Sequence, residues 1–98
     1  MAFFAVTLET GPNWDYSRAR RDQDAWDEHA AFMDALVEDG FVVLGGPIGE
    51  GDGANVLLVL DAEDAAEIRA RLAEDPWGED MLTFESIRPW SVWLRAAP

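Results

Sequence analysis

Apolar and polar positions repeat with different periods along the chain, and these periods divide it into strands and helices. Four short stretches are rich in apolar, β-branched or aromatic residues, a composition typical of β-strands. The predicted strands are residues 2–9, residues 41–44, residues 54–60 and a segment within 81–94 that is expected to bend or break at Pro89.

Two longer stretches carry apolar residues three and four positions apart, which is the spacing of one face of an α-helix. The first is predicted over about residues 24–39, and Gly40 stands where a C-terminal cap belongs. The second is predicted over about residues 61–74, with Asp61 as its N-cap. It ends before Pro76, because the residue that precedes a proline avoids the helical region.

The order of these elements predicts an α+β fold of the ferredoxin-like βαββαβ kind, a four-stranded antiparallel sheet with both helices on one face. Residues 3–6, 41–44 and 56–60 are apolar on both faces of their predicted strands. A strand that is apolar on both sides is normally covered on both sides. Because two helices cover only one face, we expect a second copy of the chain to cover the other, in a two-fold symmetric homodimer.

Composition restricts the partners of this chain. Its 98 residues are expected to form a single domain, 1–98, since two domains would not fit. Twenty acidic residues against seven basic ones, all of them arginine, give a net charge of −13. Phosphate backbones and anionic membranes would repel such a surface, so we expect neither a nucleic acid nor a membrane as partner.

The chain contains no cysteine, which excludes disulfides, thiolate metal sites and cysteine nucleophiles. It has a single histidine and no carboxylates at cluster spacing, so neither a metal nor another cofactor is expected. No stretch approaches the roughly 20 apolar residues of a membrane span, and residues 1–4 carry no basic leader signal. The expected location is therefore the cytoplasm.

His29 is the first candidate for chemistry. In the predicted helix it lies near the middle of the apolar stripe formed with Trp26, Met33 and Leu36, so it should point toward the sheet. Asp75 continues the apolar stripe of the second helix, and two helices packed side by side could bring the two residues together. An aspartate that holds one imidazole nitrogen leaves the other as a general base. The alternatives are a structural histidine in the core and an aspartate that only caps the chain before the proline.

Four further residues are candidates for binding a substrate. Arg21, from the arginine cluster before the first helix, could receive an anionic group, although pairing with nearby aspartates is the more ordinary role. The segment 45–53 lacks the Lys and Ser/Thr of a phosphate-binding loop and is predicted to be a turn. Within it, Gly46 and Pro47 could form a pocket wall. Trp77 could cover a ligand or simply fill the core.

Four ordered segments of the chain resemble the YciI-like, or YCII-related, family. They are Trp26 to Leu36, Gly40 to Pro47, Glu74 to Trp77 and Ile87 to Trp90. The similarity spans almost the whole chain. Each motif is short, but the ordered set is fairly specific.

The resemblance implies a dimeric α+β barrel built from ferredoxin-like subunits, in agreement with the homodimer argued from the two-faced strands. It also implies an active site formed by a histidine and an aspartate, which here correspond to His29 and Asp75. We therefore predict a cofactor-independent enzyme of the lyase or isomerase type that acts on a small, aromatic or anionic molecule by general acid–base chemistry. Two alternatives remain open: a module that binds a small molecule without converting it, and a dimerisation module with an exposed apolar patch near Trp90 and Trp93.

Overall fold

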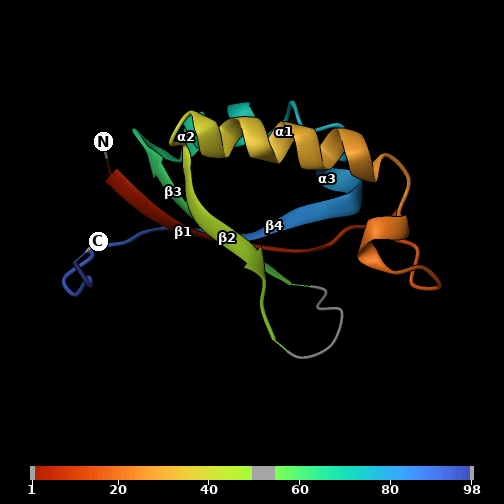
Figure 1. The fold of residues 1–98 in the computed structure, drawn as a ribbon, viewed down its shortest axis with the longest axis horizontal. Coiled ribbons are helices and arrows are strands. Elements are labelled where there is room, and N and C mark those ends of the chain that lie inside the picture. Colours follow the sequence, from red (N-terminus) through yellow and green to blue (C-terminus); the bar gives the residue numbers. More distant parts are fainter. Residues whose placement is uncertain (1, 50–54, 98) are drawn as a thin grey trace.

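The computed structural model describes residues 2–49 and 55–97. It contains four strands, and the helices lie on one side of them (Figure 1). The elements follow one another in the order strand, helix, strand, strand, helix, helix, strand, with a short 3-10 helix, η1, before the first α-helix. Their bounds are β1 Ala2–Thr10, η1 Arg20–Asp22, α1 Trp26–Glu38, β2 Val42–Pro47, β3 Val56–Ala62, α2 Ala65–Leu72, α3 Gly78–Met81 and β4 Leu82–Pro89.

The four strands form one antiparallel sheet with the order β2-β3-β1-β4. The helices cover one face, which we call the helix face (Figure 1). Val6, Leu60 and Ile68 are the largest fully buried side chains between this face and the helices. Alternation along the strands explains the arrangement, since Phe4, Val6 and Leu8 of β1 are buried and the residues between them are less so. The predicted α+β fold with a four-stranded antiparallel sheet is confirmed.

The first helix ends as predicted. Gly40 adopts a positive φ of 77°, which glycine tolerates without steric cost. Its amide donates to the Val37 carbonyl at 3.0 Å, and the Phe41 amide donates to the Leu36 carbonyl at 3.0 Å. These two bonds form a Schellman motif, which satisfies carbonyls that the helix end would otherwise leave unpaired. The cap turns the chain directly into β2.

The start of the second helix differs from the prediction, and Asp61 is not its N-cap. Strand β3 continues through Ala62, which pairs with Ala2 and is fully buried. The cap is Asp64, whose carboxylate accepts a hydrogen bond from the Glu67 amide at 2.8 Å. Two acidic positions close together can both satisfy the sequence rule for a cap. Pairing of β3 with β1 decides between them.

The glycine-rich segment differs as well. Gly45, Gly46 and Pro47 belong to β2 instead of forming a turn, because they pair with Leu58, Leu57 and Val56 of β3. The rest of the predicted turn includes residues 50–53, which lie outside the described residues, as does residue 54, the predicted start of the next strand. The last strand lies within the predicted range and ends at Pro89, but a short helix, α3, precedes it.

The sheet face opposite the helices, which we call the open face, is also apolar. Phe3, Leu57 and Val59 occupy alternate positions to the core residues of β1 and β3. At the edge of the sheet, Leu44 of β2 pairs with Val59 and is 61% exposed. The open face is thus apolar, as the two-faced strands predict, but the chain itself covers part of it. Val59 is only 5% exposed, and the Arg95 guanidinium lies 5.1 Å from the ring centroid of Phe3. No helix in the described part of the chain is long and apolar enough to cross a membrane.

Candidate active site

His29 and Asp75 meet at the junction of α1 with the turn that follows α2. The imidazole Nδ1 lies 2.9 Å from Oδ1 and 2.8 Å from Oδ2 of the Asp75 carboxylate. His29 is only 9% exposed. Since a carboxylate can only accept, Nδ1 is the nitrogen that donates to it. In the neutral ring, Nε2 therefore carries the lone pair.

Trp77 fixes both members of this pair. Its indole stacks on the His29 ring, with 3.8 Å between the ring centroids and 7° between the planes. Its backbone amide donates to Asp75 Oδ1 at 2.9 Å, and its indole Nε1–H donates to the Asp24 carbonyl at 2.7 Å. Trp77 is 4% exposed, so these bonds are shielded from water. Few other orientations of His29 are compatible with these contacts.

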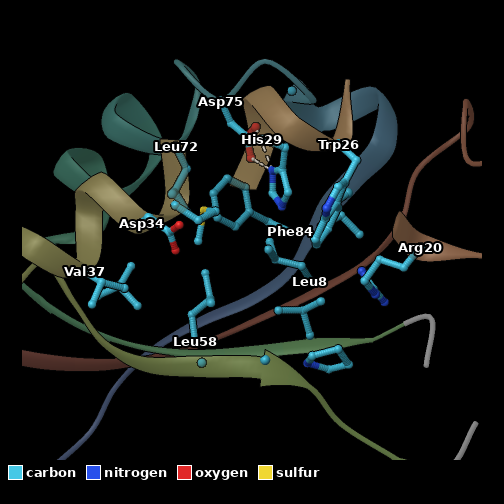
Figure 2. Close-up of a pocket in the computed structure, with 18 of the residues that line it drawn as sticks. Leu8, Arg20, Trp26, His29, Asp34, Val37, Leu58, Leu72, Asp75 and Phe84 are labelled. Atoms are coloured by element: carbon cyan, nitrogen blue, oxygen red, sulfur yellow. Dashed lines mark hydrogen bonds and ion pairs between the residues drawn. The ribbon is translucent and has the colours of Figure 1, made fainter. Parts of the chain in front are cut away.

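A cavity of about 260 Å³ lies between α1 and the helix face of the sheet, and His29 forms part of its wall (Figure 2). The ring nitrogen that does not contact Asp75 points into the cavity (Figure 2). An apolar cavity of about 150 Å³ can hold benzene, so this one has room for a substituted ring. Its walls are mostly apolar and include Leu8, Trp26, Met33, Val37, Val42, Pro47, Val56, Leu58, Leu72, Leu82 and Phe84.

Among residues 2–49 and 55–97, three charged side chains besides His29 and Asp75 line the cavity: Arg20 from η1, Asp34 from α1 and Glu79 from α3. Arg20 is 9% exposed, and its guanidinium lies 5.0 Å from the ring centroid of Trp14. Trp14 in turn meets Trp77 edge to face at 5.6 Å. A cation and an oriented imidazole therefore face the same apolar space.

Gln23 holds the loop that carries Arg20. Its side-chain oxygen accepts from the Asp15 amide at 3.1 Å, and its Nε2 donates to the carbonyls of Asp15 at 2.7 Å and Arg18 at 3.1 Å. Gln23 is 4% exposed, so the loop closes around a buried amide group whose oxygen and nitrogen both form hydrogen bonds. This network sets the position of η1 against the first turn of α1.

Two charged groups on the outside of this loop have shifted pKa values. Hydrogen bonds from the hydroxyl and the amide of Ser17 lower the pKa of Asp15. The hydrogen bond that Arg18 donates to Asp24 at 2.9 Å, together with the charge of that carboxylate, raises the pKa of Arg18. Both groups are exposed, so they affect the loop only weakly.

The residues predicted from sequence occupy different parts of the site. His29 and Asp75 are hydrogen-bonded to each other, and Gly46 and Pro47 line the cavity. Arg21 is exposed and lies outside the lining, whereas its neighbour Arg20 is buried and within it. Trp77 does not line the cavity and lies against the face of His29.

Arg20, Asp34 and Gly45 are among the lining residues that the sequence analysis did not identify. Arg20 could not be distinguished from Arg21, because a loop has no regular repeat that predicts which side chains point inward. Asp34 was overlooked because five residues of α-helix turn it about 140° away from His29, outside the apolar stripe. Gly45 was assigned to a turn, whereas a Cβ there would lie 2.5 Å from Leu58 Cδ2.

Among the residues that the structure describes, no group of three or more His, Cys, Asp or Glu side chains could hold a metal ion.

The fold and the cavity define a ferredoxin-like α+β domain with a histidine–aspartate pair at an apolar pocket. The chain belongs to the family of the YCII-related domain, whose model matches residues 2–91. A solved structure of 5-chloro-2-hydroxyhydroquinone dehydrochlorinase (TftG) from Burkholderia phenoliruptrix AC1100, in complex with 2,5-dihydroxybenzoquinone, is similar in fold. The match covers 96% of this chain and 95% of that one, with 19% sequence identity and a TM-score of 0.52. No curated protein matches the chain.

Proposed function

We propose that this protein is an enzyme that performs general acid–base chemistry on a small aromatic or anionic molecule, of the lyase or isomerase type. The observation that carries the proposal is the double contact of His29 Nδ1 with the Asp75 carboxylate, at 2.9 and 2.8 Å, while the other ring nitrogen faces the cavity. A base that is held at one nitrogen and open at the other fits proton abstraction.

In the proposed reaction, His29 Nε2 takes a proton from an O–H or C–H group of the substrate. The electron pair of that bond forms a new π bond, and either a leaving group departs with its bonding electrons or a proton returns at another carbon. The Asp75 carboxylate stabilises the imidazolium that forms. In the elimination, release of the proton to water restores the neutral ring. In the isomerisation, the imidazolium gives the proton to the second carbon and becomes neutral in that step. No step of this proposed reaction uses a cofactor.

Arg20 is the better candidate than Arg21 for receiving an anionic group, because it is buried and lines the cavity. A cation there would stabilise the negative charge that builds up on a substrate oxygen when its proton leaves. The structurally similar dehydrochlorinase acts on a chlorinated hydroxyhydroquinone, and loss of hydrogen chloride is an elimination of the kind described above. That compound is therefore the first probe to use.

The test is chloride release from 5-chloro-2-hydroxyhydroquinone by the wild type, His29→Gln and Asp75→Asn. We expect the wild type to release chloride and both variants to do so at least about 100-fold more slowly, because a positioned acid–base group usually contributes that much to the rate. Prior treatment with EDTA should leave the rate unchanged. Circular dichroism would show that both variants fold. Equal release by the wild type and His29→Gln, or none by either, would contradict the proposal.

We also propose that the protein is a homodimer in which the open faces of two sheets pack together, as the resemblance to dimeric α+β barrels implies. The apolar residues of the open face, with Leu44 61% exposed at its edge, support this arrangement. Trp93 is 91% exposed beyond β4 and could extend the same contact.

Sedimentation equilibrium of Leu44→Asp tests the dimer, with Ala66→Asp as the control. Ala66 is exposed on α2, which lies on the other side of the sheet. Charge at Leu44 should disfavour burial against a second copy and yield a monomer, whereas the control should remain a dimer. A monomeric wild type, or a Leu44→Asp variant that dimerises as tightly as the control, would overturn this arrangement.

A further inference from the structure

Asp34 is a charged side chain in an apolar part of the cavity wall. It comes from α1, and its carboxylate is directed from the helix toward the cavity, near Leu72 and Leu58 (Figure 2). Within residues 2–49 and 55–97, no hydrogen bond or ion pair involves this carboxylate. The side chain is solvent-exposed, so it lies at the mouth of the cavity. Neither the acid–base pair nor the fold requires an acidic residue at this position.

Arg20 and Asp34 lie at opposite ends of the cavity, with His29 between them (Figure 2). The order along the chain explains this separation. Arg20 lies in η1, before the start of α1, while Asp34 is eight residues into the helix from Trp26. At 1.5 Å per residue this is about 12 Å along the helix axis. The cavity thus has an arginine toward one end, the imidazole in the middle and an aspartate toward the other end, and Glu79 of α3 also lines it.

We propose that Asp34 determines specificity, and that the substrate class is an aromatic molecule with an anionic oxygen at one end and a hydrogen-bond donor, such as a hydroxyl, at the opposite end. This inference rests on the proposed function, because it describes the ligand of the same site. The anionic oxygen would lie at Arg20 and the donor at Asp34. The ring would lie between these two ends, next to His29 Nε2.

Two physical reasons support the role of Asp34. A carboxylate accepts hydrogen bonds and cannot donate them, so it favours a hydroxyl or amino group over an ether, a halogen or bare carbon. It also repels a second anionic group, so it disfavours ligands with a negative charge at both ends. The surrounding side chains, Met33, Val37, Leu72 and Phe84, are apolar and offer a donor no other partner.

The test uses three ligands with the same ring: benzoate, 4-hydroxybenzoate and terephthalate. Binding is followed by NMR through the ring signals of His29, the single histidine of the chain. For the wild type we expect 4-hydroxybenzoate to bind about 10-fold more tightly than benzoate, as for a hydrogen bond to a charged group. Terephthalate, with carboxylates at both ends, should bind more weakly than benzoate.

In Asp34→Ala we expect the advantage of the hydroxyl to disappear and terephthalate to bind as well as benzoate. Asp27→Ala is the matched control, because it removes the same charge from an exposed position of the same helix that does not line the cavity. It should preserve the order of the wild type. Because these are binding measurements, their failure is distinguishable from failure of the proposed function, which is measured by His29-dependent turnover.

The inference is overturned if Asp34→Ala keeps the same order of affinities as the wild type and Asp27→Ala. It is also overturned if none of the three ligands shifts the His29 signals, because the proposal names this class of molecule. In either case a rate that depends on His29 would leave the acid–base proposal standing without this substrate class.

Discussion

The imidazole of His29 and the indole of Trp77 lie parallel, with 3.8 Å between their centroids and 7° between their planes. Asp75 holds the edge of the imidazole and Trp77 holds its face, and the Trp77 amide also donates to Asp75. One residue therefore orients the ring directly and orients its hydrogen-bond acceptor as well. The imidazole that we propose as the base is thus positioned before any ligand enters, and such positioning lowers the barrier to proton transfer.

Replacing Trp77 should affect stability and the orientation of His29 together. Trp77→Ala should lower the free energy of unfolding by about 3–5 kcal/mol, the usual cost of removing a buried tryptophan. Trp77→Phe retains an aromatic face but lacks the indole donor to the Asp24 carbonyl, and should cost less. Urea unfolding gives the energies, and NMR relaxation of the His29 ring reports its order. A His29 ring in Trp77→Ala that is as rigid as in the wild type would argue against this positioning role.

Two adjacent glycines in β2 offer a matched pair of substitutions. A Cβ at Gly45 would lie 2.5 Å from Leu58 Cδ2, while a Cβ at Gly46 meets no atom within 4 Å. Gly45→Ala should therefore push Leu58, which lines the cavity, and cost about 1–3 kcal/mol by overpacking. Gly46→Ala should leave the unfolding midpoint close to that of the wild type. Thermal unfolding of both variants tests the difference, and equal midpoints would contradict it.

Gln23 should be required for the position of Arg20. Gln23→Ala removes an acceptor and two strong donors from a buried site, so unfolding should become easier by about 1–3 kcal/mol. The backbone NMR signals of residues 15–20 should shift. Asp22→Asn, an exposed neighbour in the same 3-10 helix, serves as the control and should change neither property. Unaltered loop signals in Gln23→Ala would be evidence against this role.

The loop should also respond to acid. Ser17 donates two hydrogen bonds to Asp15, and they lower the pKa of this carboxyl below its ordinary value of 3.8. A lowered pKa means that the contribution of Asp15 to stability is present above that ordinary value and disappears as the pH falls through the lowered one. Ser17→Ala should raise the pKa of Asp15, measured by carbon NMR of its side chain. Tyr16→Phe, which also removes a hydroxyl, should leave it unchanged; equal titrations in the two variants would refute the assignment.

The sequence was sufficient to predict most of the fold, because local periods and caps agree with the final packing. The end of α1 is an example, since Gly40 follows the last periodic residue and caps the helix. The boundary of β3 could not be predicted in the same way. Asp61 and Asp64 are both acceptable caps, and only the pairing of Ala62 with Ala2 excludes the first. That pairing joins residues sixty positions apart, beyond the reach of a local rule.

In the candidate site, too, the features set by local sequence patterns were predictable and those set by long-range packing were not. The direction in which His29 points followed from its place on the apolar stripe of a helix, so its side of α1 was predictable. The choice between Arg20 and Arg21 was not, because Gln23 shapes the loop through bonds to backbone groups that carry no sequence signal. Which arginine of the loop lines the cavity is therefore visible only in three dimensions.

The measurement that tests the central claim most directly is nitrogen NMR of the His29 ring in the wild type, at a pH at which the imidazole is neutral. The account predicts that the proton resides on Nδ1, donated to Asp75, and that Nε2 carries the lone pair toward the cavity. It also predicts that Asp75→Ala releases this preference. A proton found on Nε2 in the wild type would leave no base facing the cavity and would contradict the account.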